Sequence, residues 1–124
     1  MILVDTSVWV DHLRVGDAKL VGLLGGGEAA CHPFVLGELA CGNIRNRREI
    51  LTLLAALPAV AKAQDAEVIE FIDQHQLMGK GLGLIDVHLL ASCMLDGARL
   101  WTRARRLAGV ASRLGLDGGT RPAV

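Results

Sequence analysis

Three acidic residues stand where the surrounding sequence is apolar. Asp5 directly follows a short apolar run at the start of the chain, and Glu38 and Asp86 each interrupt an apolar stretch. If the three carboxylates converge in the fold, their mutual repulsion requires a cation. Carboxylate oxygens without histidine or cysteine beside them suit Mg²⁺, with Mn²⁺ as the alternative. Such a site can activate a water molecule and offset the charge of a phosphoryl transition state.

The same residues also have an ordinary structural interpretation. Asp5 and Asp86 can each cap a helix, and Glu38 can be an exposed residue on a helix surface. Thr6 and Ser7 directly follow Asp5. Their hydroxyls can cap a helix, or they can orient the neighbouring carboxylate or a bound water. Both interpretations stay open on this evidence alone.

Positive charge is concentrated in two short segments. The formal net charge is zero, yet residues 1–96 hold 7 basic and 12 acidic side chains, whereas residues 97–124 hold 6 arginines and one aspartate. The clustered arginines are Arg103, Arg105 and Arg106 in the second part, and Arg45, Arg47 and Arg48 in the first. They form either solvated helix faces or a surface for an anionic partner, because phosphate binding draws on clustered arginine.

Short apolar runs alternate with helical patterns along the chain. Strands are predicted at residues 2–4, 29–31, 59–61 and 100–102, and helices after each of them, with glycine or proline at several of the boundaries. This alternation is typical of an α/β fold with a parallel sheet covered on both faces. Ligands of such folds bind at the carboxyl ends of the strands, which is where Asp5 is expected.

Length and composition exclude several classes of protein. A chain of 124 residues with 52% hydrophobic content fits one folded domain. An aromatic content of 3% is too low for a base-stacking platform, and three cysteines without a C-x-x-C pair predict neither a disulfide framework nor a zinc site. No apolar stretch reaches the roughly 20 residues of a membrane span, and the chain starts without a basic leader. We therefore expect a soluble, cytoplasmic protein with no membrane partner.

The first nine residues, MILVDTSVW, resemble the opening of PIN-domain proteins, specifically the ribonuclease toxins of VapBC-type toxin–antitoxin pairs. Three later segments resemble further motifs of that family: residues 35–39 with Glu38, residues 84–92 with Asp86, and residues 100–107. Any one of these motifs is weak evidence. Four of them in the right order, over nearly the whole chain, make the resemblance specific.

The resemblance implies a three-layer α/β/α domain over residues 1–115, with a mostly parallel central sheet of four to five strands and a flexible tail over residues 116–124. It implies an Mg²⁺-dependent endoribonuclease that hydrolyses RNA phosphodiesters, forms a homodimer and binds a cognate VapB-type antitoxin. Asp5 and Asp86 are then metal ligands, and Glu38 completes the coordination or holds a water. Thr6 and Ser7 support these acids, and the clustered arginines bind the RNA backbone.

One position departs from the family pattern. The last motif normally carries a fourth acid where this sequence has Ala104, although the neighbouring residues fit. The loss of a carboxylate weakens binding of Mg²⁺ and reduces the repulsion among the remaining acids. We therefore expect impaired cleavage with the fold retained, whether the alanine arose naturally or by design.

Two alternatives belong to other functional classes. The first is a non-catalytic protein of the same fold that binds RNA or an antitoxin, and Mg²⁺-dependent cleavage distinguishes it from the nuclease. The second is a phospho-acceptor domain with Asp5 as nucleophile. A dehalogenase-type site of that class needs a second aspartate where Ser7 stands, and a receiver needs a lysine after the last strand, which Thr102 and Arg103 do not supply.

Overall fold

The structure, a computed structural model that describes residues 1–119, contains one small parallel sheet. Its strands are β1 (Ile2–Val4), β2 (Ala29–Ala30) and β3 (Arg99–Trp101), and their spatial order is β2-β1-β3. Both partners run parallel to β1, which pairs Leu3 with Ala30 on one side and with Leu100 on the other. Parallel pairs need long crossover connections, and the intervening helices supply them.

Within residues 1–119, seven helices connect and flank these strands. They are α1 (Thr6–Val15), α2 (Ala18–Gly25), α3 (Pro33–Cys41), α4 (Arg47–Ala55), α5 (Asp65–His75), α6 (Leu84–Asp96) and α7 (Arg105–Arg113). Two of the helix ends lie at a proline or a glycine that the sequence indicated as a boundary. Pro33 lies in the first turn of α3, where its missing N–H costs no hydrogen bond, and Gly97 ends α6 in the left-handed conformation that glycine adopts without strain.

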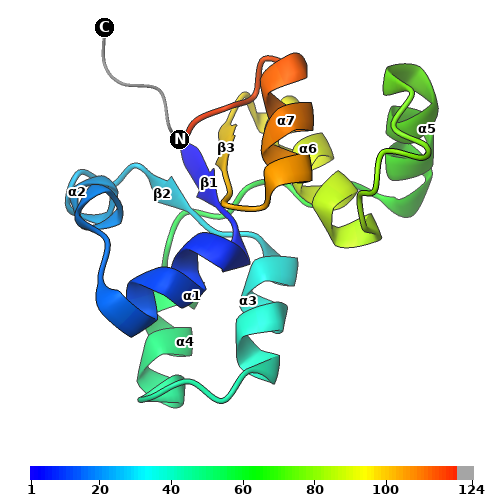
Figure 1. The fold of residues 1–124 in the computed structure, drawn as a ribbon. Coiled ribbons are helices and arrows are strands. Elements are labelled where there is room, and N and C mark those ends of the chain that lie inside the picture. Colours follow the sequence, from blue (N-terminus) through cyan, green and yellow to red (C-terminus); the bar gives the residue numbers. More distant parts are fainter. Residues whose placement is uncertain (120–124) are drawn as a thin grey trace, which may run out of the picture.

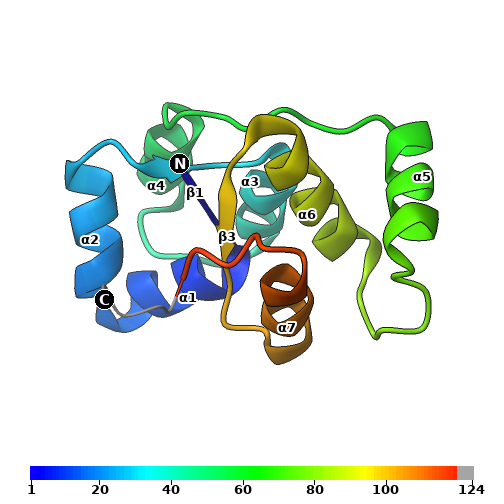
Figure 2. The same cartoon turned by 90° about the horizontal axis from the view of Figure 1, so that it is seen from above.

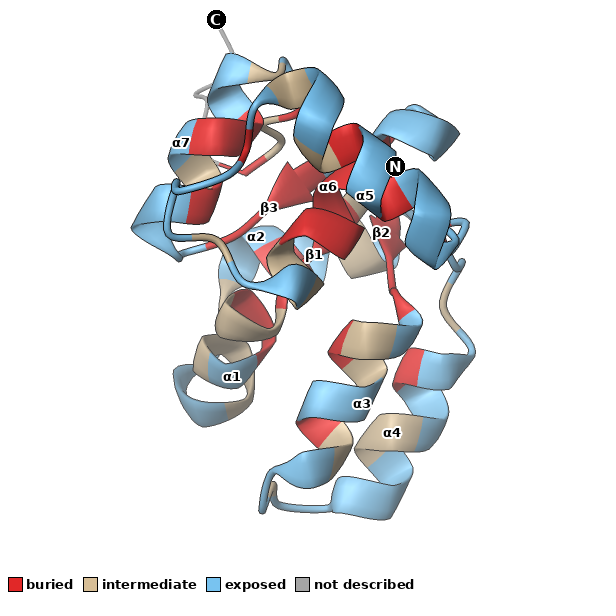
Figure 3. Cartoon of the chain, turned by 90° about the vertical axis from the view of Figure 1, so that its right-hand side faces the viewer, coloured by how far each residue is buried: buried red, intermediate tan, exposed pale blue. Residues whose placement is uncertain are grey.

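The helices lie on both sides of the sheet, as expected for three α/β/α layers. Figures 1 and 2 show α1 and α7 on one side of the strands and α3, α4 and α6 on the other, with α5 packed against α6 at the edge of the molecule. The buried residues are most concentrated on the strands and on α6 (Figure 3). Of the helices within residues 1–119, none combines the length and apolarity needed to cross a membrane.

The sheet is smaller than the four to five strands expected. Residues 59–61 contribute a single bridge, between Ala59 and Cys31, instead of a strand. The residue before them, Pro58, has no N–H, and the N–H of Ala61 is taken by the Asp96 carboxylate at 2.6 Å. The parallel pairing of this segment with the chain at Cys31 therefore ends after a single bridge.

The other edge of the sheet is extended by the chain after α7. Leu116 is buried, and its carbonyl accepts a hydrogen bond from the Leu100 N–H at 2.7 Å, while Asp117 bridges to Leu100. Residues 116–118, which the sequence placed in a flexible tail, are thus paired with Leu100 of β3. The end of the expected tail, residues 120–124, lies outside the described residues.

Candidate active site at the carboxyl end of the sheet

Asp5 directly follows the central strand and is almost fully buried, with 7% of its surface exposed. Its Oδ2 accepts hydrogen bonds from the Ser7 hydroxyl at 2.9 Å and from the Thr102 hydroxyl at 2.7 Å. Ser7 lies at the start of α1 and Thr102 directly after β3, so two separate elements fix one orientation of the carboxylate. Within residues 1–119, no group donates a hydrogen bond to Oδ1, which leaves that oxygen free to ligate.

The same hydroxyls fix the connection from β3 to α7. The Arg103 N–H donates to Ser7 Oγ at 3.0 Å, and the Ala104 N–H donates to Thr102 Oγ1 at 3.0 Å. We call Asp5, Ser7, Thr102 and the two backbone N–H groups of residues 103 and 104 the Asp5 network. Ala104 is exposed and occupies the N-cap position of α7, where its methyl group cannot cap the helix. An aspartate at position 104 would therefore have its side chain attached to the backbone next to the Asp5 network.

Glu38 is joined to the same end of α1. The Thr6 hydroxyl donates to Glu38 Oε1 at 2.7 Å, and α1 packs against α3. Glu38 is exposed, as its ordinary structural interpretation predicted. Of the two interpretations of Thr6 and Ser7, the structure agrees with the second, because Asp5 holds the N-cap position of α1 and both hydroxyls bind carboxylates.

Asp86 makes the capping contact that its alternative interpretation predicted. It is the third residue of α6, and its Oδ2 accepts a hydrogen bond from the Gly83 N–H at 3.1 Å. Among the described residues, no three Asp, Glu, His or Cys side chains form a group that could hold a metal ion. The donor chemistry of the acids, carboxylate oxygen only, fits a hard divalent cation. The structure joins Asp5 to Glu38 through neighbouring residues and leaves Asp86 bonded to its own helix.

A buried polar contact, which the sequence analysis missed, joins α3 to α6. His32 Nδ1 accepts the Phe34 N–H at 2.9 Å and so caps α3, while Nε2 lies 3.1 Å from the Ser92 hydroxyl. The Phe34 ring and the buried His88 ring are nearly perpendicular, with 4.7 Å between their centroids. Burial, followed by the charges of His88 and Lys62, lowers the pKa of His32 to about 4. His32 is therefore neutral at physiological pH. Its position directly before Pro33, in the first turn of α3, is the sequence signal that could have indicated its role as a helix cap.

Arg103, which was expected to bind RNA, forms ion pairs with two aspartates in the structure. Its Nε lies 3.0 Å from Asp11 Oδ2 and its Nη2 lies 2.5 Å from Asp17 Oδ2. The Leu20 N–H, together with Arg103, lowers the pKa of Asp17 below its usual value despite partial burial. This ion-pair group ties the start of α7 to α1 and α2, so Arg103 positions the Asp5 network.

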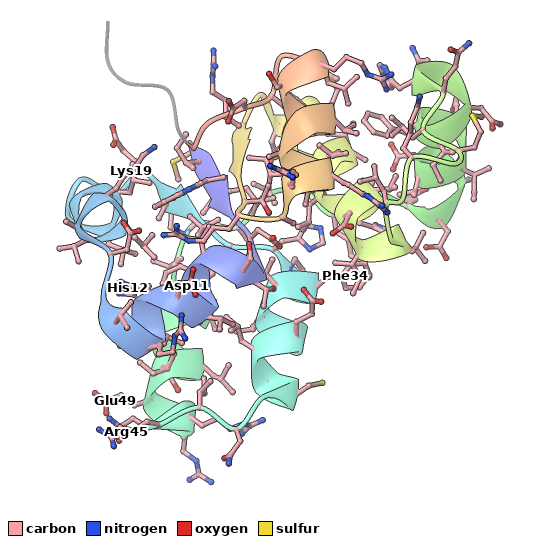
Figure 4. All side chains as sticks on the ribbon, in the orientation of Figure 1. Asp11, His12, Lys19, Phe34, Arg45 and Glu49 are labelled. Atoms are coloured by element: carbon pink, nitrogen blue, oxygen red, sulfur yellow. The ribbon has the colours of Figure 1, made fainter. Side chains whose placement is uncertain are left out.

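The arginines near α4 lie away from α7. Arg47 donates two hydrogen bonds to the Ala40 carbonyl, at 3.0 and 2.7 Å, and so stabilises the end of α3. Arg45 and Arg48 are exposed, and Figure 4 shows Arg45 near Glu49 at the opposite end of the molecule from α7. Arg105 and Arg106 are exposed in the first turn of α7, directly after the Asp5 network.

Comparison with known proteins agrees with this arrangement. The sequence matches the PIN domain family over residues 2–112. It is 49% identical over 117 residues to "Ribonuclease VapC32" in each of two strains of Mycobacterium tuberculosis, covering 94% of both chains. The crystal structure of PAE2754 from Pyrobaculum aerophilum shares the fold, with a TM-score of 0.60 and 16% identity over 92% of this chain and 94% of that one. The chain therefore belongs to the PIN domain family.

Proposed function

We propose that this chain is a VapC-type endoribonuclease that hydrolyses RNA phosphodiesters with the help of a divalent cation, Mg²⁺ or Mn²⁺. The observation that carries the proposal is the Asp5 carboxylate, which is buried at the carboxyl end of the central strand and fixed through one oxygen only. The carboxylate oxygen that accepts no hydrogen bond from residues 1–119 can ligate a hard divalent cation. The names of the two mycobacterial relatives support ribonuclease activity.

The acids and hydroxyls take different roles in this proposal. Asp5, Asp86 and Glu38 would hold the cation, which would have to draw together side chains that do not form a metal-binding group in this structure. The cation would supply positive charge against the charge that develops on the attacked phosphate. Ser7 and Thr102 hold the Asp5 carboxylate in one orientation, and Thr6 does the same for Glu38. Because these hydroxyls are already oriented by the fold, little reorganisation is needed when substrate binds.

The proposal includes a partner and an assembly. As a VapC-type toxin, the chain would pair with a VapB-type antitoxin and act as a homodimer. The support for both is the family resemblance and the names of the relatives. Copurification of a short partner encoded beside this chain, and the mass of the isolated protein in solution, test these two points separately.

Impaired cleavage because of Ala104 is the sharpest part of the proposal. Aspartate at this position would add a fourth carboxylate beside the Asp5 network, and it would also cap α7. Capping alone contributes about 1 kcal/mol to stability, and asparagine caps as well as aspartate does. The variants Ala104→Asp and Ala104→Asn therefore separate the acid from the cap.

Cleavage of a labelled RNA in Mg²⁺ should be measured for the wild-type chain, both Ala104 variants and Asp5→Asn. We expect both Ala104 variants to unfold at higher urea, only Ala104→Asp to cleave faster, by about tenfold or more, and Asp5→Asn to be inactive. Equal cleavage by the wild-type chain, Ala104→Asp and Ala104→Asn would refute the impairment. RNA binding without cleavage by any of them would favour the non-catalytic alternative.

A further inference from the structure

A second feature of the molecule is a shallow, strongly basic concavity on the surface of α7. It has a volume of about 240 Å³ and lies between α7 and the loop that precedes α6. Its lining residues are Lys80, Arg105, Arg106, Gly109, Val110 and Arg113. We call these six residues the α7 concavity. Lys80 and Arg113 were not among the RNA-binding residues expected from the sequence.

The α7 concavity has four cationic side chains and no acidic one in its lining. All four residues are exposed, and the ion pairs found within residues 1–119 belong instead to Arg14 and Arg103. Arg105 and Arg106 occupy the first turn of α7, which contains no acid. Positive charge there opposes the helix dipole, so these cations do not stabilise the helix. Their charge remains available to an anion.

The concavity is shaped by two glycines. Gly81 has a φ of 77°, and a side chain there would collide with the Arg106 side chain, so the loop carrying Lys80 lies directly on α7. Gly109 lies mid-helix, where it costs about 1 kcal/mol relative to alanine. A Cβ at position 109 would meet no atom within 4 Å, so the space above the glycine is open. Arg105, Gly109 and Arg113 are four residues apart and share one helix face.

We propose that the α7 concavity binds a backbone phosphate of single-stranded RNA that flanks the cleaved phosphodiester. This inference rests on the proposed function for its substrate class. The concavity begins directly after Ala104, and α7 rises about 1.5 Å per residue, so Arg113 lies about 12 Å along the helix from Arg105. An RNA chain whose scissile phosphate lies at Asp5 can therefore place a neighbouring phosphate over Gly109.

The lining favours RNA over an acidic protein segment. Three of the four cations are guanidinium groups, which match the geometry of phosphate oxygens with paired N–H donors. Val110 is the lone large apolar residue of the lining and is itself buried, so the concavity lacks a pocket for an apolar anchor side chain. An acidic peptide thus becomes the competing outcome of the experiment.

The test measures the affinity of a short, labelled single-stranded RNA by fluorescence anisotropy in EDTA over a series of KCl concentrations. Gly109→Glu places a carboxylate among the cations, and Gly109→Gln is its matched neutral control. We expect Gly109→Glu to bind RNA about tenfold more weakly than Gly109→Gln. Lys80→Gln and Arg113→Gln should each reduce the slope of log K against log salt by about 0.7. Arg14→Gln, on the last turn of α1, should change affinity by less than about twofold.

Several results would overturn the inference. Equal RNA affinity of Gly109→Glu and Gly109→Gln would show that RNA does not bind at the concavity. If Arg14→Gln lost as much RNA affinity as Lys80→Gln and Arg113→Gln, the loss would reflect the net charge of the protein and not a site on α7. Binding of a labelled polyglutamate peptide as tightly as RNA, with the same ranking of variants, would assign the concavity to an acidic protein segment. Circular dichroism of each variant confirms that it is folded.

Cleavage assays in Mg²⁺ separate this inference from the proposed function. If the chain cleaves RNA and the Lys80 and Arg113 variants keep wild-type affinity and salt slope, the inference fails while the function stands. If these variants lose affinity and salt slope but neither the wild-type chain nor Ala104→Asp cleaves RNA, the ribonuclease function fails while the phosphate site stands.

Discussion

The Asp5 network and the α7 concavity lie on either side of Ala104, and they are built in opposite ways. In the network, a buried carboxylate is held by hydroxyls from two elements, and those hydroxyls also accept hydrogen bonds from the backbone of the connection between β3 and α7. In the concavity, four exposed cations share an open space without acidic partners. The comparison indicates that the network sets chemistry through fixed geometry, whereas the concavity sets affinity through charge.

The network should therefore be sensitive to packing, and the largest expected effect concerns His32, which caps the helix that carries Glu38. The pKa of His32 falls to about 4 in the fold from an ordinary value of 6.5. Because the unfolded chain binds a proton below pH 6.5 and the folded chain does not until about pH 4, stability decreases as the pH falls through this window. The loss amounts to about 3 kcal/mol once the pH is near 4.

Urea denaturation of the wild-type chain and His32→Asn, at neutral pH and near the lower end of this window, checks the His32 prediction. Asparagine keeps a cap for α3 but does not titrate, so the variant should start less stable and lose less on acidification. If the wild-type chain and the variant lose the same stability, His32 is not the group that titrates. His88 and Lys62 are present in both proteins, so the difference between them reports the titration of His32, including the effect of those two charges on it.

An intermediate effect is expected at Thr102, within the network itself. Thr102→Val keeps the shape of the side chain but removes the hydroxyl that donates to Asp5 and accepts the Ala104 N–H. Supporting hydrogen bonds of this kind typically contribute 10- to 100-fold to activity, so we expect turnover in Ala104→Asp to fall about tenfold when Thr102→Val is added. RNA affinity in EDTA should stay unchanged. Thr102→Ser should restore turnover, and a loss of affinity in place of turnover would contradict the division between the two regions.

The sequence predicted the positions of these regions better than their contacts. Apolar runs bounded by glycine and proline located Asp5 at a strand end and Asp86 in the first turn of a helix, because those signals are local. The contact between Asp5 and Thr102 joins residues 97 positions apart, and no local pattern specifies it. The arginine cluster was visible, yet the ion pairs of Arg103 with Asp11 and Asp17 and the close approach of Gly81 to Arg106 depend on how loops pack.

The smallest expected effect tests how open the α7 concavity is. Gly109→Ala adds one methyl group, which meets no atom within 4 Å, and alanine favours the helix by about 0.5–1 kcal/mol over glycine. Urea denaturation should therefore show a gain in stability of that size, while RNA affinity stays within about twofold, as for other substitutions that remove no contact. A loss of stability would mean that other atoms fill the space above Gly109. A tenfold loss of RNA affinity would mean that RNA contacts the backbone at Gly109. In either case RNA binding at the concavity would depend on precise packing, as the geometry of the Asp5 network does, and could not be explained by charge alone.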